Sequence, residues 1–143
     1  MLEYTITAAQ AAGAVGAANT RSAEVLFDIS ASAGPNERLM NPAELLLSAF
    51  AACVLKNVER YAGILSFAYE RAEIVVRGAR QDAPPRMISV AYTLTLWTSE
   101  PEHRVQLLQR NLEKYGTVYN TLAASAQVNG EIRVIAPPAS AAP

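Results

Sequence analysis

The chain contains one cysteine, Cys53, which ends the stretch N-P-A-E-L-L-L-S-A-F-A-A-C at residues 41–53. If this stretch is helical, Phe50 lies about one turn before the thiol, and Lys56 and Asn57 lie about one turn after it. An ammonium group within one turn would favour the thiolate, which is the reactive form, and the apolar side would bind an apolar substrate. Cys53 is therefore a candidate nucleophile, with Phe50, Lys56 and Asn57 as candidate binding residues.

The other residue types that carry chemistry offer Cys53 no obvious partner. Free cysteine is among the most buried residue types and packs as a small hydrophobe, so the residues alone favour packing over reactivity for Cys53. The single histidine, His103, lies in the first turn of a predicted amphipathic helix, away from its apolar side, which favours exposure over a Cys-His pair. With no second histidine or cysteine near it, His103 offers no ligand spacing, and we predict no metal site.

The charged residues give weaker indications of a catalytic role. Glu70 and Glu73 are three positions apart on a predicted strand, so they point to opposite faces and make no acid and base pair. We expect both to be solvated. Arg21, just before a predicted strand, would by itself be a surface charge.

The element that carries Cys53 is a well-marked helix. Asn41 is a good N-cap, Pro42 suits the first helical position, and Glu44 stands where it can reach back to the cap. The apolar pattern continues to about Tyr61, and Gly63 is the residue best able to take the left-handed conformation that closes a helix. The first half is apolar on every side, which predicts a helix that runs through the middle of the fold.

The flanking elements are mostly strands. Alternation of apolar and polar residues predicts strands at 2–8, 23–30, 67–78 and 86–98, with the last two paired as a hairpin across Q-D-A-P-P-R. Gly13 and Gly16, between the first two, are interpreted as turn residues.

The C-terminal third is expected to be helical before a last strand. Ser99, Pro101 and Glu102 form a second capping-box pattern. Apolar residues then recur at helical spacing: Val105, Leu108, Leu112 and Tyr115. Gly116 breaks that helix, a short helix follows at about 118–126, E-I-R-V-I-A forms the last strand, and 137–143 is a disordered tail. The resulting order β-β-α-β-β-α-α-β predicts an α+β fold, with the long helix packed on a curved antiparallel sheet.

The composition restricts the kinds of partner and the cellular setting that we expect. With 143 residues, 12 basic and 13 acidic side chains and a net charge of -1, the chain is long enough for one domain and gives no electrostatic reason to expect nucleic acid or a membrane as partner. The apolar run at 45–55 is too short to span a bilayer, and the N-terminus lacks the pattern of a signal peptide. One cysteine cannot form an intrachain disulfide, which fits a reducing, cytoplasmic setting.

The stretch G-P-N-E-R-L-M-N-P-A-E-L-L-L-S-A-F-A-A-C resembles the signature of the OsmC/Ohr family, the osmotically inducible and organic hydroperoxide resistance proteins. Thr20-Arg21 before A-E-V-L-F-D, then K-Y-G-T-V-Y-N-T-L and G-E-I-R-V, follow in the expected order over about residues 3–136. The resemblance implies a single OsmC-like domain at residues 1–136. It also implies an intertwined homodimer with a central helix on a wrapped sheet and active sites at the subunit interface.

The resemblance also implies roles for individual residues. Peroxidases of the family use a reactive cysteine on the central helix, an arginine and a glutamate that hold it as thiolate, and a second cysteine that resolves the sulfenic acid. Cys53 matches the reactive cysteine and Arg21 the arginine. Ala43 stands where the glutamate directly follows N-P, and Glu44, one residue later and about 100° around the helix, is a further candidate binding residue. Gly116 stands at the place of the second cysteine.

Two functional hypotheses follow, and neither involves a cofactor. In the first, Cys53 reduces a small organic hydroperoxide, and an external thiol or dithiol restores it in a one-cysteine cycle. In the second, the chain is a non-catalytic member that binds an apolar small molecule at the dimer interface, and Cys53 is packing. A third reading is an interaction module whose dimer surface is its function.

Overall fold

A computed structural model of the chain describes residues 1–138, so most of the predicted C-terminal tail lies outside the described residues. The chain divides into two compact units, an N-terminal unit at Met1–Leu46 and a C-terminal unit that begins at Leu47. The first turn of the long helix α1 (Pro42–Leu65) belongs to the N-terminal unit, and the rest of it belongs to the C-terminal unit. Residues 1–138 form a mixed α+β architecture with three helices, as predicted, but their strands form two sheets and not the single curved sheet that we expected.

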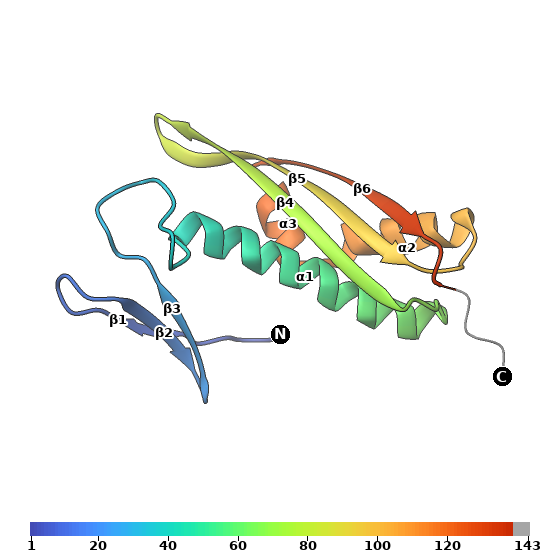
Figure 1. Cartoon of the computed structure of the whole chain (residues 1–143), viewed down its shortest axis with the longest axis horizontal. Coiled ribbons are helices and arrows are strands. Elements are labelled where there is room, and N and C mark those ends of the chain that lie inside the picture. The colour runs from blue at the N-terminus through green and yellow to red at the C-terminus, as the bar shows by residue number, and fades with distance from the viewer. Residues whose placement is uncertain (139–143) are drawn as a thin grey trace. The chain divides into compact units, whose positions relative to one another are not determined.

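The N-terminal unit contains an antiparallel sheet in the order β1 (Thr7–Ala9), β2 (Gly16–Thr20) and β3 (Ala23–Phe27) (Figure 1). β1 is shorter than the strand predicted at 2–8, and β3 ends before the predicted residue 30. β2 was not predicted, because its sequence G-A-A-N-T lacks large apolar residues that would alternate.

The two glycines that were interpreted as turn residues behave differently. Gly13 has a φ of 74° and lies in the turn between β1 and β2, as predicted. Gly16 is instead the first residue of β2, where it pairs with Phe27. A Cβ atom at Gly16 would lie 2.2 Å from the Phe27 ring, so the glycine makes room for that ring.

Helix α1 begins as predicted. The Asn41 backbone N–H donates to Glu44 Oε1 (3.1 Å), and the Glu44 N–H donates to Asn41 Oδ1 (2.9 Å). This reciprocal pair is a capping box, and it satisfies the backbone N–H groups of both residues at the start of the helix. The Leu45 N–H then makes the first helical hydrogen bond to the Asn41 carbonyl (2.9 Å).

The end of α1 differs from the prediction. The helix continues beyond Tyr61, and Ser66, with a φ of 49°, closes it in place of Gly63. The Phe67 N–H donates to the Ala62 carbonyl (2.8 Å), and the Ser66 N–H donates to the Gly63 carbonyl (3.4 Å), which is the Schellman pattern. Phe67 is only 4% exposed, so burial of its ring fixes where the helix ends.

The C-terminal unit contains a second sheet in the order β4 (Arg71–Asp82), β5 (Pro85–Trp97) and β6 (Gln127–Ile135). β4 and β5 form the predicted antiparallel hairpin. β6 pairs with β5 in parallel, so this sheet is mixed, unlike the antiparallel sheet that we predicted. The parallel pairing is possible because a long helical connection separates the two strands in sequence.

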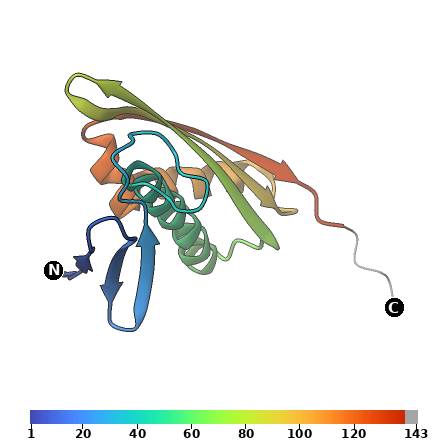
Figure 2. The same ribbon diagram turned by 60° about the vertical axis from the view of Figure 1, so that its left-hand side comes forward.

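That connection contains α2 (Glu102–Tyr115) and α3 (Thr117–Ala123). All three helices lie on one face of the sheet (Figures 1 and 2). Val105, Leu108 and Leu112 are buried, as their spacing predicted, whereas Tyr115 is about half exposed. The second capping box does not form, because the N-cap of α2 is Pro101 and no side chain caps it. The core combines α1, β5, α2 and α3, with members that include Phe50, Val54, Val58, Val90, Tyr92, Leu94, Leu96, Leu108, Leu112 and Leu122.

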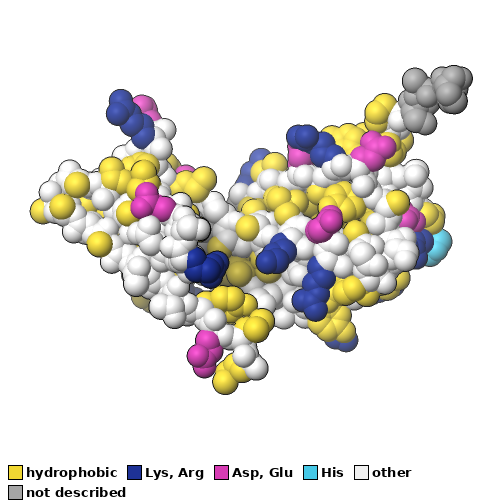
Figure 3. All heavy atoms as spheres, turned by 90° about the horizontal axis from the view of Figure 1, so that it is seen from below, with side chains coloured by type: hydrophobic (Ala, Val, Ile, Leu, Met, Phe, Trp, Pro, Cys, Tyr) yellow, Lys and Arg dark blue, Asp and Glu magenta, His cyan; other side chains and the backbone are white. Residues whose placement is uncertain are grey.

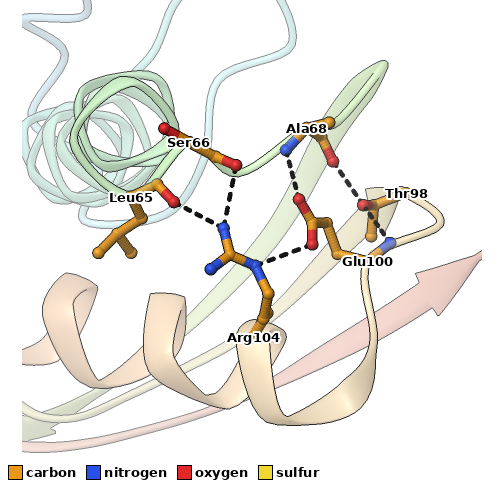
Figure 4. A network of polar contacts seen from close by, with 6 residues as sticks. All are labelled: Leu65, Ser66, Ala68, Thr98, Glu100 and Arg104. Carbon is orange, nitrogen blue, oxygen red and sulfur yellow. Dashed lines mark hydrogen bonds and ion pairs between the residues drawn. The ribbon is translucent and has the colours of Figure 1, made fainter.

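A polar network ties the end of α1 to the start of α2 (Figure 4). The Arg104 guanidinium donates to the carbonyls of Leu65 (2.6 Å) and Ser66 (3.0 Å), and its Nε donates to Glu100 Oε2 (2.9 Å). The other Glu100 oxygen accepts the backbone N–H of Ala68 (2.8 Å). These bonds satisfy carbonyls that the end of a helix leaves without helical partners.

The position of Gly63 supplies a test of the helix end. Gly63 lies inside α1 with nothing within 4 Å of an added Cβ, so Gly63→Ala is expected to stabilise the protein by about 0.5–1 kcal/mol through helix propensity. Urea unfolding of both proteins measures the difference. If Gly63 closed the helix in the left-handed conformation, the same substitution would destabilise the protein.

The network of Glu100 predicts a pH dependence. The Ala68 N–H, and after it Arg104, lowers the pKa of Glu100. Because this folded-state pKa lies below that in the unfolded chain, the stabilisation exists above about pH 4.3 and disappears as the pH falls through the folded-state value. Glu100→Gln should therefore destabilise the protein at pH 7, and its deficit relative to wild type should shrink at pH 3.

Urea midpoints at the two pH values measure that deficit. Glu102→Gln removes an exposed carboxylate two residues further along the chain, in the first turn of α2, and it is the control for the loss of one negative charge. A Glu100→Gln deficit of equal size at pH 3 and pH 7 would contradict the role of the carboxylate.

Candidate functional site

Cys53 lies at the edge of the buried face of α1. That face consists of Phe50, Val54, Asn57, Val58 and Tyr61, which recur every three or four residues. With 3.6 residues per turn, Cys53 is rotated by about 60° from Phe50, toward the exposed side. Its side chain is accordingly half-buried, and it is a free thiol. The thiol is thus anchored next to the core without being enclosed by it.

Asn57 contacts the sulfur directly. Its Nδ2 donates to Cys53 Sγ over 3.7 Å, one helical turn further along α1. Asn57 is 9% exposed, so its amide is held among packed residues. Lys56, in contrast, is exposed to solvent. Of the two polar residues predicted one turn after Cys53, the structure therefore brings the amide to the sulfur.

The turn between α2 and α3 lies against the same amide. This turn consists of the buried Gly116, and a Cβ atom at this position would lie 3.4 Å from Asn57 Nδ2 and 2.8 Å from Tyr119 Cβ. The sequence singled out Gly116 as a helix breaker, but it gave no indication that this turn packs on Asn57. The structure therefore adds Gly116 and Tyr119 to the surroundings of the thiol.

Phe50 is a core residue in this structure. It is fully buried, and its ring centroid lies 5.7 Å from that of Tyr92 and 5.6 Å from that of Tyr119. The three rings join α1, β5 and α3 one turn before Cys53. Contact of Phe50 with a bound ligand stays a prediction.

Tyr92 has an unusual environment that the sequence did not reveal. Its hydroxyl is the only buried side-chain polar atom without a hydrogen-bond partner among residues 1–138. Burial, then the neighbouring Tyr119 and Glu113, raises the pKa of Tyr92 well above its ordinary value. Burial and Glu113 also raise the pKa of Tyr119. Both phenols are therefore protonated and neutral at physiological pH.

The two other residues proposed for the site lie in the N-terminal unit. Arg21 is exposed in the turn between β2 and β3, has a φ of 52°, and donates from Nη1 to Thr20 Oγ1 (3.4 Å). Glu44 is engaged in the capping box at the start of α1. Their roles at Cys53 stay predictions.

The remaining residues weighed for chemistry lie at the surface. His103, Glu70 and Glu73 are exposed, as predicted, and Glu73 pairs with Arg71. Residues 1–138 contain no group of three histidine, cysteine or acidic residues arranged to hold a metal ion. Seen from below, charged side chains of both signs are dispersed among apolar ones (Figure 3). No helix in the described part of the chain is long and apolar enough to cross a membrane.

The described hollows do not include Cys53. In the C-terminal unit, a hollow of about 460 Å³ lies between α2 and β6 and is lined by residues that include Gln106, Gln109, Ile132 and Val134. In the N-terminal unit, a hollow of about 500 Å³ is lined by residues that include Asp28, Ile29 and Leu39. An apolar cavity beside the thiol, which the binding hypothesis predicts, is thus not among them.

A long helix on a mixed sheet is the architecture that this chain shares with solved OsmC-like structures. The family model described as OsmC-like protein matches residues 34–131, and the chain belongs to this family. No functionally curated protein matches the chain.

Solved structures share the fold at low sequence identity. An OsmC-like protein from Mycoplasma pneumoniae superposes with a TM-score of 0.84 and 19% identity, over 94% of this chain and 98% of that one. An organic hydroperoxide resistance protein OsmC from Legionella pneumophila gives 0.69 and 15%, over 94% and 100%. The organic hydroperoxide resistance protein OhrB of Bacillus subtilis gives 0.67 and 13%, over 92% and 98%.

The packing at Gly116 supplies a test of this part of the site. Gly116→Ala places a methyl group against Tyr119 Cβ, so we expect a loss of about 1–3 kcal/mol of unfolding free energy through overpacking. The same change at Gly63, which has open space, is the matched control. Urea unfolding measures both. A Gly116→Ala protein as stable as wild type would show that the α2–α3 turn is not packed as described.

Proposed function

We propose that the protein reduces organic hydroperoxides with Cys53 and is restored by an external thiol. The observation that carries the proposal is the half-buried sulfur of Cys53, which receives a hydrogen bond from a buried amide on the central helix of an OsmC-like chain. Two solved structures with the same fold are named as organic hydroperoxide resistance proteins, which supports the substrate class.

The first step transfers one oxygen atom to sulfur. The Cys53 thiolate attacks the terminal oxygen of the hydroperoxide, an S–O bond forms and the O–O bond breaks. The alkoxide that leaves takes a proton and departs as the alcohol. The peroxide is reduced by two electrons, and Cys53 is oxidised to a sulfenic acid.

The second step needs a thiol from outside the chain. Cys53 is the only cysteine of the sequence, and Gly116 carries no side chain, so no intrachain disulfide can form. A low-molecular-weight thiol attacks the sulfenic sulfur, releases water and leaves a mixed disulfide. A second thiol equivalent, or the second sulfur of a dithiol, then cleaves it, which regenerates Cys53 and releases the oxidised reductant.

We further propose that the chain works as a homodimer in the cytoplasm, where such thiols are available. Exposed apolar side chains in the C-terminal unit support an association surface, among them Ile64 on α1 (61% exposed) and Val75 on β4 (54% exposed). The dimer would bring a second copy of the same chain to each thiol.

The peroxidase activity is tested by Cys53→Ser. Wild-type protein should consume an organic hydroperoxide such as cumene hydroperoxide with a dithiol as reductant, and Cys53→Ser should fall to the uncatalysed rate. Without reductant, stoichiometric peroxide should leave a sulfenic acid on Cys53 that dimedone traps and mass spectrometry detects, because the chain has no second thiol to consume it.

Equal peroxide consumption by wild-type protein and Cys53→Ser would overturn the proposal. A lipid-like or aromatic molecule that co-purifies with both proteins, found by native mass spectrometry, would then favour the binding hypothesis.

A further inference from the structure

The buried face of α1 contains one amide side chain, that of Asn57. The other buried residues of the helix are Phe50, Val54, Val58 and Tyr61. Burial of an amide is costly unless its hydrogen bonds are made, so an amide in this place requires a polar partner. The partner of its Nδ2 is Cys53 Sγ, at 3.7 Å.

We propose that Asn57 is a positioning residue that holds and polarises the Cys53 sulfur through its side-chain N–H group. The inference rests on the proposed function, in which Cys53 reacts as the thiolate. A hydrogen bond from a neutral amide becomes stronger when its acceptor is an anion, so Asn57 favours the thiolate over the thiol. The same N–H can remain on the sulfur while oxygen is transferred to it.

The surrounding packing keeps the amide in place. Asn57 and Cys53 are four residues apart on one helix, which puts their side chains on neighbouring turns. The backbone of the α2–α3 turn lies close to the amide at Gly116. A Cβ atom added at this glycine would lie only 3.4 Å from Asn57 Nδ2. The donor is therefore ordered before the reaction begins, and little side-chain entropy is lost when the sulfur becomes charged.

The titratable groups around this pair come from four elements. Lys56 is exposed on α1 itself, Glu113 lies on α2, Tyr119 on α3, and Tyr92 on β5. Both phenols are neutral at physiological pH, so they add no charge there. Lys56 and Glu113 are the same in wild type and in every Asn57 variant, so any influence that they have on the sulfur is common to all of these proteins. A change in the pH dependence of Cys53 chemistry in Asn57 variants would thus report the amide.

The experiment measures the alkylation rate of Cys53 by iodoacetamide from pH 5 to pH 10 in wild type, Asn57→Leu and Asn57→Asp. Leucine keeps the branched shape but removes the donor, so we expect the midpoint of the rate profile to rise and the rate at pH 7 to fall about 3- to 10-fold. Aspartate keeps the shape but places a negative charge beside the sulfur, so its midpoint should rise further.

Asn111→Leu is the matched control. Asn111 is a half-buried helical asparagine whose Nδ2 donates to the Leu107 carbonyl (2.8 Å), so its replacement removes an amide hydrogen bond on α2. Its alkylation profile should coincide with that of wild type. Coincident profiles for wild type and both Asn57 variants would overturn the inference.

A measurement on the unaltered chain covers the case in which an Asn57 variant does not fold. The side-chain amide resonances of Asn57 in a ¹⁵N–¹H spectrum should shift with the same pH midpoint as Cys53 alkylation, and this shift should vanish in Cys53→Ser. Asn57 amide resonances that do not shift as Cys53 is deprotonated, or that shift equally in Cys53→Ser, would overturn the inference. Because neither measurement uses peroxide, each can fail or succeed independently of the peroxidase activity.

Discussion

The burial of one face of α1 determines where every other part of the C-terminal unit lies. Phe50 is fully buried, and its contacts with Tyr92 and Tyr119 hold α1 against β5 and α3. Rotation of the helix that exposed the neighbouring Cys53 further would also expose Phe50, at a cost of about 1.5–3 kcal/mol for that side chain alone. The depth of the thiol is therefore set by the core.

Two glycines allow this core to close around two tyrosines. A Cβ at Gly130 on β6 would lie 2.0 Å from the ring of its cross-strand partner Tyr92, and a Cβ at Gly116 would lie 2.8 Å from Tyr119 Cβ. In the sequence resemblance, Gly116 stands at the place of the second cysteine of family peroxidases. The glycine that packs the α2–α3 turn on Asn57 is therefore also the position at which the proposed cycle relies on an external thiol.

Local sequence patterns predicted the elements whose limits are set locally. The capping box of Asn41 and Glu44, the β4–β5 hairpin and the buried side of α2 all follow from neighbouring residues. The features that differ depend on contacts remote in sequence. β2 is a strand because it pairs with its neighbours, the buried Phe67 sets the end of α1, and the direction of β6 follows from the helices that connect it to β5. Gly63 was the better local choice for a helix end, and packing overrode it.

The surroundings of Cys53 also combine a contact that follows from local sequence with one that depends on residues remote in sequence. The contact from Asn57 to Cys53 was implicit in a four-residue spacing, whereas the proximity of Gly116 to this pair joins segments about 60 residues apart and has no local pattern. Lys56 was equally near in sequence, but an exposed ammonium is screened by water and salt, so its effect on the sulfur weakens with ionic strength. A buried amide at a fixed distance is screened much less. In the role that we propose, the neutral Asn57 is therefore the more constant of the two influences on the sulfur.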